Sequence, residues 1–175
     1  SSASYFTALM WAYNNGIVKG TGDGTTFSPK ANCTRGQFAL MLYRLAGKPD
    51  VSGLTNPFKD VKKPDPYYKA VLWAYNAGII KGTWATRFSP SDSVKREQLV
   101  LMLYRMAGKP SVTTAKNPFS DVEKSNPCYK AVLWAVEQKI TSGTGDGTTF
   151  SPGADCTRYQ LVLFLYRFNK LMKFI

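Results

Sequence analysis

The stretch "CTRGQFALMLYR", residues 33–44, decides the fold of this 175-residue chain. It recurs as "VKREQLVLMLYR" at 94–105 and as "CTRYQLVLFLYR" at 156–167. In the first copy Phe38, Met41, Leu42 and Leu45 have the i, i+3, i+4, i+7 spacing of a helix that buries one face. Three such segments at a spacing of about 61 residues predict a chain made of three copies of one unit.

The same period relates residues outside this helix, and we call each copy a module. It relates Trp11, Trp73 and Trp134, then Gly20, Gly82 and Gly143, then Phe27, Phe88 and Phe150. Each module is predicted as helix, loop, helix and linker. We expect module 1 at 1–47 with a truncated start, module 2 at 56–108 and module 3 at 117–175. Because one small helical pair cannot bury its apolar faces alone, the sequence predicts a single mainly α domain, a pseudo-threefold assembly of three helix-loop-helix repeats with extended linkers.

The first helix of each module ends at a position that favours glycine. In module 2 it reads "YKAVLWAYNAG", and Gly16 and Gly78 suit a left-handed C-terminal cap. Module 3 has Lys139 at this position. If the left-handed conformation is kept there, we expect it to cost about 1 kcal/mol.

An arginine opens the second helix of every module. Thr34 and Gln37 form a predicted capping box, so Arg35 falls in the first helical turn. A cation there opposes the helix dipole at a cost of roughly 0.3–1 kcal/mol. Since Arg96 and Arg158 repeat the pattern, we expect each arginine to meet an anion, helped by the free N–H groups of the same helix end.

Two kinds of anion fit that expectation. A bound carboxylate or phosphate would accept two parallel hydrogen bonds from a guanidinium. The other candidate is an acid of the chain itself, and Asp60 and Asp121 in the F-x-D-V segments are the obvious ones. The two roles overlap if an acid orients the arginine for a ligand.

The tryptophans lie away from the apolar stripe of the first helix. At about 100° per residue, Trp73 shares an arc with Lys69 and Asn76. An indole on a polar arc either packs against the neighbouring repeat or offers an apolar plate beside a groove. A plate beside cationic groups would suit an acidic glycan.

Composition narrows the chemistry. The net charge is +12, from 23 Lys and Arg against 11 Asp and Glu, which favours an anionic partner such as nucleic acid, anionic lipid or an acidic glycan. No apolar run approaches the roughly 20 residues that span a membrane. Histidine is absent, which removes Ser-His-Asp and Cys-His catalysis. Cys33 and Cys156 occupy the position of Val94, so we expect small buried side chains rather than a disulfide.

The order F-x-D-V, Y-x-A-V-x-W-A, G-I-x-x-G, F-S-P, T-R-x-Q resembles the S-layer homology (SLH) domain over essentially the whole chain, three times. The resemblance implies three modules in a pseudo-trimer with grooves between them. It implies a non-catalytic anchor, outside the cell on a bacterial wall, that binds an anionic secondary cell-wall polysaccharide, often through a pyruvate ketal. No cofactor is implied.

The resemblance also implies the site residues by position. Arg35, Arg96 and Arg158 would meet the ketal carboxylate, and Gly20, Gly82 and Gly143 would let the backbone approach the sugar. Trp11, Trp73 and Trp134 would line grooves, and Asp60 and Asp121 match a groove-edge aspartate.

Several departures from the family pattern predict unequal grooves. Module 1 lacks its F-x-D-V segment, and module 2 has a short loop with Trp84 and Arg87. Lys95 replaces the capping threonine, and each module has glutamine where the family has glutamate. We expect only one or two competent grooves, and the glutamines to affect ligand preference.

Other functions have less support in the sequence. Only three glutamates are present, and no pair of carboxylates shows a recognisable spacing for glycoside hydrolysis, so we expect no enzyme. The "GTGDGTTF" loops lack the alternating oxygen ligands of a calcium loop, so a tight turn is favoured. No nucleic-acid motif is present. We expect a monomer that binds a pyruvylated or teichoic-acid-like wall polymer, without membrane insertion. The alternative is a surface-layer self-assembly module with no glycan binding of its own.

Overall fold

The computed structural model describes residues 2–114 and 116–175, with side chains from Tyr5 onward. In the described chain six helices run in the order α1 (Ser2–Asn14), α2 (Arg35–Leu45), α3 (Tyr68–Asn76), α4 (Arg96–Met106), α5 (Tyr129–Glu137) and α6 (Arg158–Met172). The pattern of two helices per module is confirmed, and the described residues form isolated bridges rather than a sheet.

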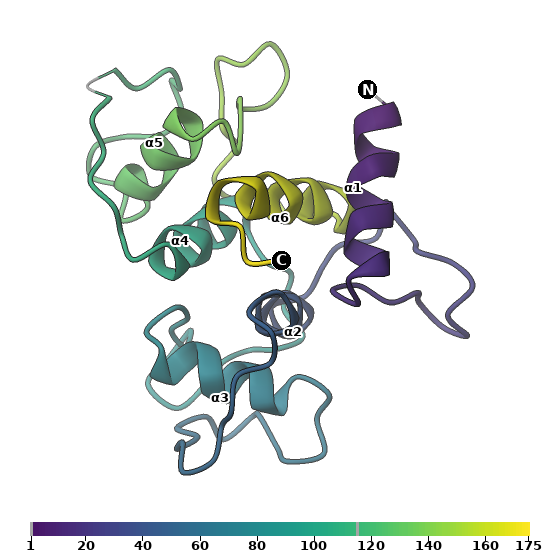
Figure 1. Cartoon of the computed structure of the whole chain (residues 1–175). Coiled ribbons are helices and arrows are strands. Elements are labelled where there is room, and N and C mark those ends of the chain that lie inside the picture. The colour runs from purple at the N-terminus through teal and green to yellow at the C-terminus, as the bar shows by residue number, and fades with distance from the viewer. Residues whose placement is uncertain (1, 115) are drawn as a thin grey trace.

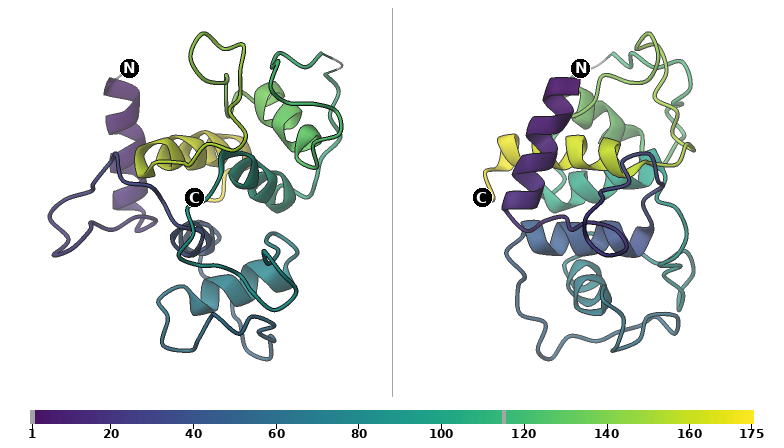
Figure 2. Two further views of the ribbon diagram at one scale, coloured as in Figure 1. Left: turned by 180° about the vertical axis from the view of Figure 1, so that it is seen from behind. Right: turned by 90° about the vertical axis from the view of Figure 1, so that its right-hand side faces the viewer.

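The helices pack in three pairs, and each pair combines two different modules. The pairs are α1 with α6, α2 with α3 and α4 with α5. In Figure 1 the second helix of each module lies toward the middle and the first helix lies outside it. Figure 2 shows the same helix pairs from behind and from the side. The mainly α, pseudo-threefold arrangement is therefore confirmed, and the α1·α6 pair closes the ring.

A triangle of backbone hydrogen bonds joins the three modules. The amide of Cys33 donates to the carbonyl of Cys156 (2.8 Å), the amide of Val94 to Cys33 (2.9 Å), and the amide of Cys156 to Val94 (3.0 Å). All three side chains are fully buried, and both cysteines are free. Burial raises the pKa of the Cys33 thiol to about 12, so it behaves as a small apolar group. The prediction for these cysteines is confirmed.

Buried aromatic and aliphatic side chains form one core cluster that includes residues of all three modules. The first-helix caps match the sequence prediction. Gly16 and Gly78 have φ of 66° and 70°, and Lys139 keeps the same conformation at 56°. Lys139 therefore carries the strain of a left-handed non-glycine residue. No helix in the described residues is long and apolar enough to cross a membrane.

Candidate functional site: the grooves between modules

Three buried arginines each reach from one module into the next. Arg35, Arg96 and Arg158 are 4%, 4% and 5% exposed. The Nε of each donates to the carbonyl of a phenylalanine in the next module and the guanidinium lies over that ring. The acceptors are Phe88 at 2.9 Å, Phe150 at 2.8 Å and Phe27 at 2.8 Å. The arginines therefore hold the ring of modules together.

The helix N-termini beside these arginines are occupied. The amide of Arg35 donates to the carbonyl of Asp92 (2.9 Å) and that of Gly36 to Pro90 (2.9 Å). In the other two modules the first two helical amides donate in the same way to the neighbouring module, at 2.9–3.1 Å. The prediction that these amides are free to help bind an anion is wrong, because the three-module closure uses them.

The aspartates do not pair with the arginines. Both oxygens of Asp121 accept backbone amides, those of Phe150 (2.8 Å) and Ser151 (2.7 Å). Asp60 does the same for Phe88 and Ser89. In the described residues the ion pairs are Arg87–Asp60 and Lys95–Asp155, so the alternative of an internal acid partner is wrong for the three arginines.

Each aspartate instead fixes the turn whose carbonyl the arginine binds. Ser89 and Ser151 have φ of 56° and 58°, a left-handed conformation that costs energy in a non-glycine residue. Burial raises the pKa of Asp60, but the amides of Phe88 and Ser89 and the charge of Arg87 outweigh it, and the pKa lies below its usual value. The aspartates thus position the arginines indirectly, through the backbone.

The three guanidinium groups differ in how far they are satisfied. Arg35 uses all its nitrogens, because Nη1 donates to Gln98 Oε1 (3.2 Å) and Nη2 to the carbonyl of Lys81 (3.0 Å). Arg158 donates from Nη2 to the carbonyl of Lys19 (3.0 Å). The Nη2 of Arg96 is buried and has no hydrogen-bond partner. An unsatisfied buried donor costs about 1–3 kcal/mol, which sets Arg96 apart from the other two arginines.

The reason lies in the loop of module 3. Where modules 1 and 2 read "GIVKG" and "GIIKG", module 3 reads "KITSG". Gly143 has φ of 90°, whereas the matching Gly20 and Gly82 lie outside the left-handed region. The hydroxyl of Thr141 accepts the Gly143 amide (3.2 Å). In the other modules the carbonyls of Lys19 and Lys81 accept a hydrogen bond from the Nη2 of Arg158 and of Arg35. The matching carbonyl in module 3 belongs to Ser142, and with this backbone change it does not accept from Arg96.

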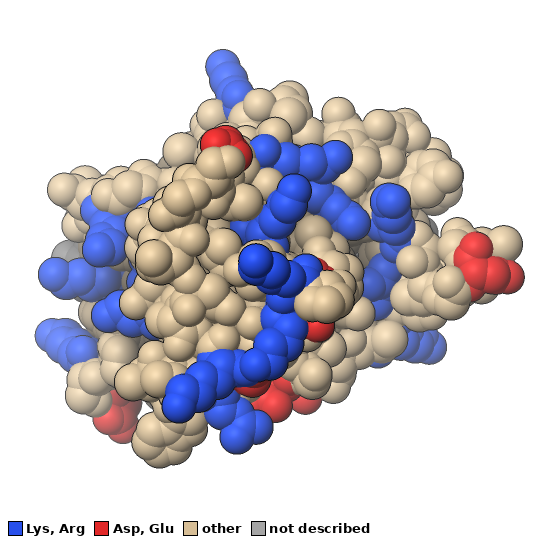
Figure 3. Space-filling view, turned by 90° about the horizontal axis from the view of Figure 1, so that it is seen from below, with Lys and Arg blue, Asp and Glu red and all other residues tan. Residues whose placement is uncertain are grey.

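A groove of about 420 Å³ lies at this place between modules 2 and 3. Module 2 contributes Arg96, and the loop of module 3 contributes Thr141, Ser142 and Gly143. The α6 side is formed by Tyr159, Gln160, Leu163, Phe164 and Arg167. Its lining residues include two arginines and no acid, which favours an anionic ligand. Basic side chains also form a band across the face of the molecule seen in Figure 3.

The glycines are needed for packing. A Cβ on Gly82 would lie 2.7 Å from Phe58 Cε1, and one on Gly143 would lie 2.5 Å from Phe119 Cε1. Those phenylalanines belong to the F-x-D-V segments of modules 2 and 3. Gly143 is the one of the three that lines the groove beside Arg96.

The tryptophans pack against tyrosines of the neighbouring module. Ring centroids are 5.4 Å apart for Trp11 and Tyr166, 5.7 Å for Trp73 and Tyr43, and 5.5 Å for Trp134 and Tyr104. Trp11 and Trp73 are half-buried, but Trp134 is 1% exposed. The ring of Trp134 therefore has no open face for a sugar, and its place is in the core between repeats.

Module 1 lacks the F-x-D-V segment, and a comparison with module 2 shows what that segment contributes. In module 2, Phe58 packs on Phe88 with ring centroids 5.5 Å apart. In module 1 the same place is an open pocket of about 170 Å³ lined by residues including Leu9, Tyr13 and Phe27. No described residue accepts a hydrogen bond from the amide of Phe27 or Ser28. The predicted inequality of the modules is present in the structure.

The glycine loops form tight turns. Oδ1 of Asp23 accepts the amide and the hydroxyl of Thr25 (3.0 and 2.7 Å), and Asp146 does the same with Thr148. The turn prediction is confirmed. The described residues contain no group of three Cys, Asp or Glu side chains placed to hold a metal ion.

Sequence reasoning missed part of the groove. Thr141, Ser142 and Arg167 line it but were not expected to. The signal was the change from "GIIKG" to "KITSG", which moves a lysine and replaces Val18 or Ile80 by a threonine. Its effect depends on a backbone conformation, which repeat comparison does not show.

Comparison with known proteins agrees with the repeat analysis. The profile of the S-layer homology domain matches residues 1–39, 57–100 and 118–161. The chain is 33% identical over 160 residues to an endoglucanase of Bacillus sp. (strain KSM-635), covering 89% of this chain and 16% of that protein. It is 35% identical over 155 residues to exoglucanase XynX of Acetivibrio thermocellus, covering 86% of the chain and 14% of the relative.

A third relative is named for its place on the cell. The chain is 27% identical over 166 residues to the surface-layer 125 kDa protein of Lysinibacillus sphaericus, covering 91% of the chain and 14% of the relative. The chain therefore spans less than a fifth of the length of each of these three proteins. Three profile matches in tandem, in register with the three structural modules, show that the chain belongs to the S-layer homology domain family.

Proposed function

We propose that this chain is a cell-wall anchoring module, located outside the cell, that binds an anionic secondary cell-wall polysaccharide through the groove between modules 2 and 3. Membership of the S-layer homology family and the similarity to a surface-layer protein support association with the cell surface. The enzyme names belong to relatives of which this chain matches 16% or less. We therefore propose that this chain has the anchoring role and that any catalysis belongs to another part of a larger protein.

The observation that carries the proposal is the free donor of Arg96. Its Nη2 is buried and unpartnered, and the side chain lines a groove of about 420 Å³. Burial lowers the pKa of this guanidinium, but arginine remains protonated. A ligand oxygen that accepts from this nitrogen, once the side chain turns toward the groove, would satisfy the buried arginine donor that the described residues leave unpaired, and an anionic oxygen would gain most.

The ligand chemistry follows from the groove. A ketal carboxylate of a pyruvylated sugar offers an acceptor oxygen of the right charge, and Gly143 leaves the backbone accessible beside it. Among the three candidate arginines, we place Arg96 first, then Arg158, and Arg35 last because its nitrogens are all engaged. A teichoic-acid phosphate is the competing ligand for the same donor.

Calorimetric titration tests this proposal. The probes are a pyruvylated wall disaccharide and the same disaccharide without pyruvate, titrated into wild type, Arg96→Ala and Arg35→Ala. We expect wild type to bind the pyruvylated sugar and to bind the other at least tenfold more weakly. We expect Arg96→Ala to lose roughly 10- to 100-fold in affinity, the range for a hydrogen bond to a charged group.

Arg35→Ala is the matched control, because it removes the same arginine-to-phenylalanine bond at a groove with no free donor. It should keep the affinity of wild type within about twofold. Equal losses in both variants would contradict the assignment to the groove beside Arg96. Binding of a glycerol phosphate polymer instead of the pyruvylated sugar would redirect the proposal to teichoic acid.

Self-assembly is the second candidate function, and exposed apolar side chains favour it. Phe6 is 63% exposed and Trp84 is 76% exposed. Exposed apolar side chains would mark an interaction site if they formed one contiguous patch. We propose that the chain is a monomer. Light scattering over a hundredfold range of protein concentration distinguishes a monomeric anchor from a self-assembling module. A constant molecular mass supports the anchor, and a mass that rises with concentration supports self-assembly.

A further inference from the structure

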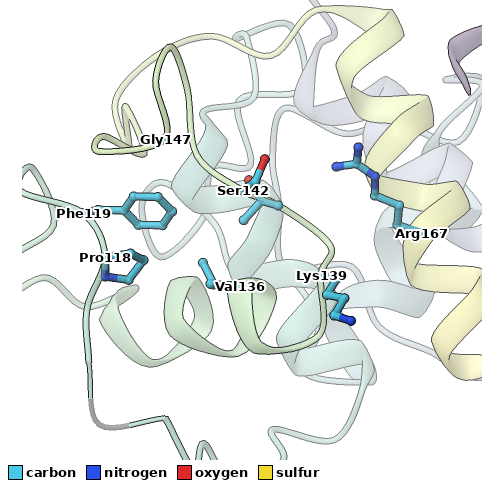
Figure 4. A pocket seen from close by; sticks show the side chains of 8 residues that line it. Pro118, Phe119, Val136, Lys139, Ser142, Gly147 and Arg167 are labelled. Atoms are coloured by element: carbon cyan, nitrogen blue, oxygen red, sulfur yellow. The ribbon is translucent and has the colours of Figure 1, made fainter. Parts of the chain in front are cut away.

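A second cavity adjoins the groove beside Arg96. It has a volume of about 430 Å³, within the range of small-ligand sites, and is lined by residues of module 3 alone. Thr141, Ser142 and Arg167 line both hollows, so the two are direct neighbours. Figure 4 shows Arg167 on one side, Phe119 and Pro118 on the other, and Ser142 between them.

The cavity has a cationic side and an apolar side. Its cations are Lys139 and Arg167, both exposed, and its lining residues contain no acid. Arg167 donates from Nη1 to the carbonyl of Ile140 (3.0 Å), as Arg44 and Arg105 do to the matching isoleucines of modules 1 and 2. The nearby Glu137 is bonded to Thr113 and is not among the lining residues. Pro118 is exposed and Val136 half-buried, and with the small exposed part of Phe119 they supply the apolar side of the cavity.

Lys139 is present at a conformational cost. It has φ of 56°, and at this position the other modules have Gly16 and Gly78. Modules 1 and 2 have their lysine three residues later, at Lys19 and Lys81, where module 3 has Ser142. In module 3 the cation therefore lies on the same side of the cavity as Arg167, and the small Ser142 takes the place of the lysine (Figure 4).

We infer that this cavity is a second subsite, which holds the next unit of the polymer and contacts an anionic substituent, carboxylate or phosphate, through Lys139 and Arg167. The inference rests on the proposed function, because the groove beside Arg96 holds the first unit. It gives two linked units of an anionic glycan adjoining sites, one between modules 2 and 3 and one in module 3.

The test uses one-unit and two-unit fragments of the pyruvylated polymer, each unit carrying its anionic group. Both are titrated into wild type, Lys139→Gly and Lys48→Gly. We expect wild type to bind the two-unit fragment about tenfold more tightly than the one-unit fragment. Lys139→Gly should lose about fivefold in affinity for the two-unit fragment, as for a solvent-exposed ion pair, and nothing for the one-unit fragment.

Lys48→Gly is the matched control, because Lys48 is an exposed lysine with the same φ of 56° and does not line either hollow. Both glycine variants should melt at a higher temperature than wild type because both relieve the same strain. A loss of affinity in a stabilised protein cannot come from misfolding.

The outcomes separate the two claims. If the one-unit fragment binds through Arg96 but the two-unit fragment binds no more tightly, the second subsite is refuted and the proposed function stands. If Lys139→Gly and Lys48→Gly bind the two-unit fragment equally well, the subsite is also refuted. If neither fragment binds wild type, both claims fail.

Discussion

Corresponding residues make different contacts at two of the interfaces, the one between modules 1 and 2 and the one between modules 2 and 3. At the first, Arg35 donates to Phe88, Lys81 and Gln98, and its guanidinium is fully engaged. At the second, Arg96 donates to Phe150 and has an unpartnered Nη2 beside a groove. The comparison shows that one interface uses every nitrogen of its arginine, whereas the other leaves one buried nitrogen without a partner.

The largest expected effect is on stability, and it separates the two arginines. We expect Arg35→Ala to lower the free energy of unfolding by about 2–4 kcal/mol, because it leaves buried carbonyl groups without a donor. Arg96→Ala should cost about 1 kcal/mol less, since one of its nitrogens is already unsatisfied. Urea denaturation measures both. Equal losses would mean that the unpaired donor of Arg96 carries no cost.

A smaller change should close the open groove. Thr141→Val gives module 3 the side chain of Val18 and removes the hydroxyl that accepts the Gly143 amide. We expect the carbonyl of Ser142 to turn back toward Arg96, so that affinity for the pyruvylated disaccharide falls about tenfold, or 1.4 kcal/mol. Titration measures the affinity, and a melting curve should show no loss of stability.

The reverse exchange sharpens the same comparison. Val18→Thr introduces the hydroxyl into module 1, where the carbonyl of Lys19 now accepts from Arg158. If a threonine at this position is what frees the arginine, the variant should bind a second equivalent of sugar. A stoichiometry that stays the same would show that the threonine needs the rest of the module 3 loop.

The smallest effect concerns the aspartate turns. The pKa of Asp60 is lower in the folded chain than the value of about 3.9 expected when unfolded, so its ionised form stabilises the fold above about pH 4. This contribution is lost as the pH falls through the folded pKa. Because the side chain is 28% exposed and screened, we expect Asp60→Asn to cost less than about 1 kcal/mol at pH 7.

Urea denaturation at pH 7 and at pH 3 checks this. The difference between wild type and Asp60→Asn should narrow as the pH falls below about 4, because the carboxyl then takes up its proton. A difference that is the same at both pH values would assign the role of Asp60 to its shape and not to its charge.

The repeat pattern predicted much of the fold. The period of about 61 residues, the apolar stripes and the capping residues gave the helices, because these are local properties of the chain. It did not give the pairing of α1 with α6, which joins segments at opposite ends of the chain. Nor did it show that the side chain of Trp134 lies in the core, because the residues that cover it include Tyr104 and Phe168 of other helices.

The sequence by itself determined that the chain is three modules of one family, that each has an arginine at a helix start, and that module 3 differs at Lys139, Thr141 and Ser142. Only the tertiary structure decided what those arginines touch. Their partners are backbone carbonyls of the next module, which every residue possesses and no side-chain pattern reveals. Which arginine retains a free nitrogen depends on the conformation at Gly143, a property of the folded chain.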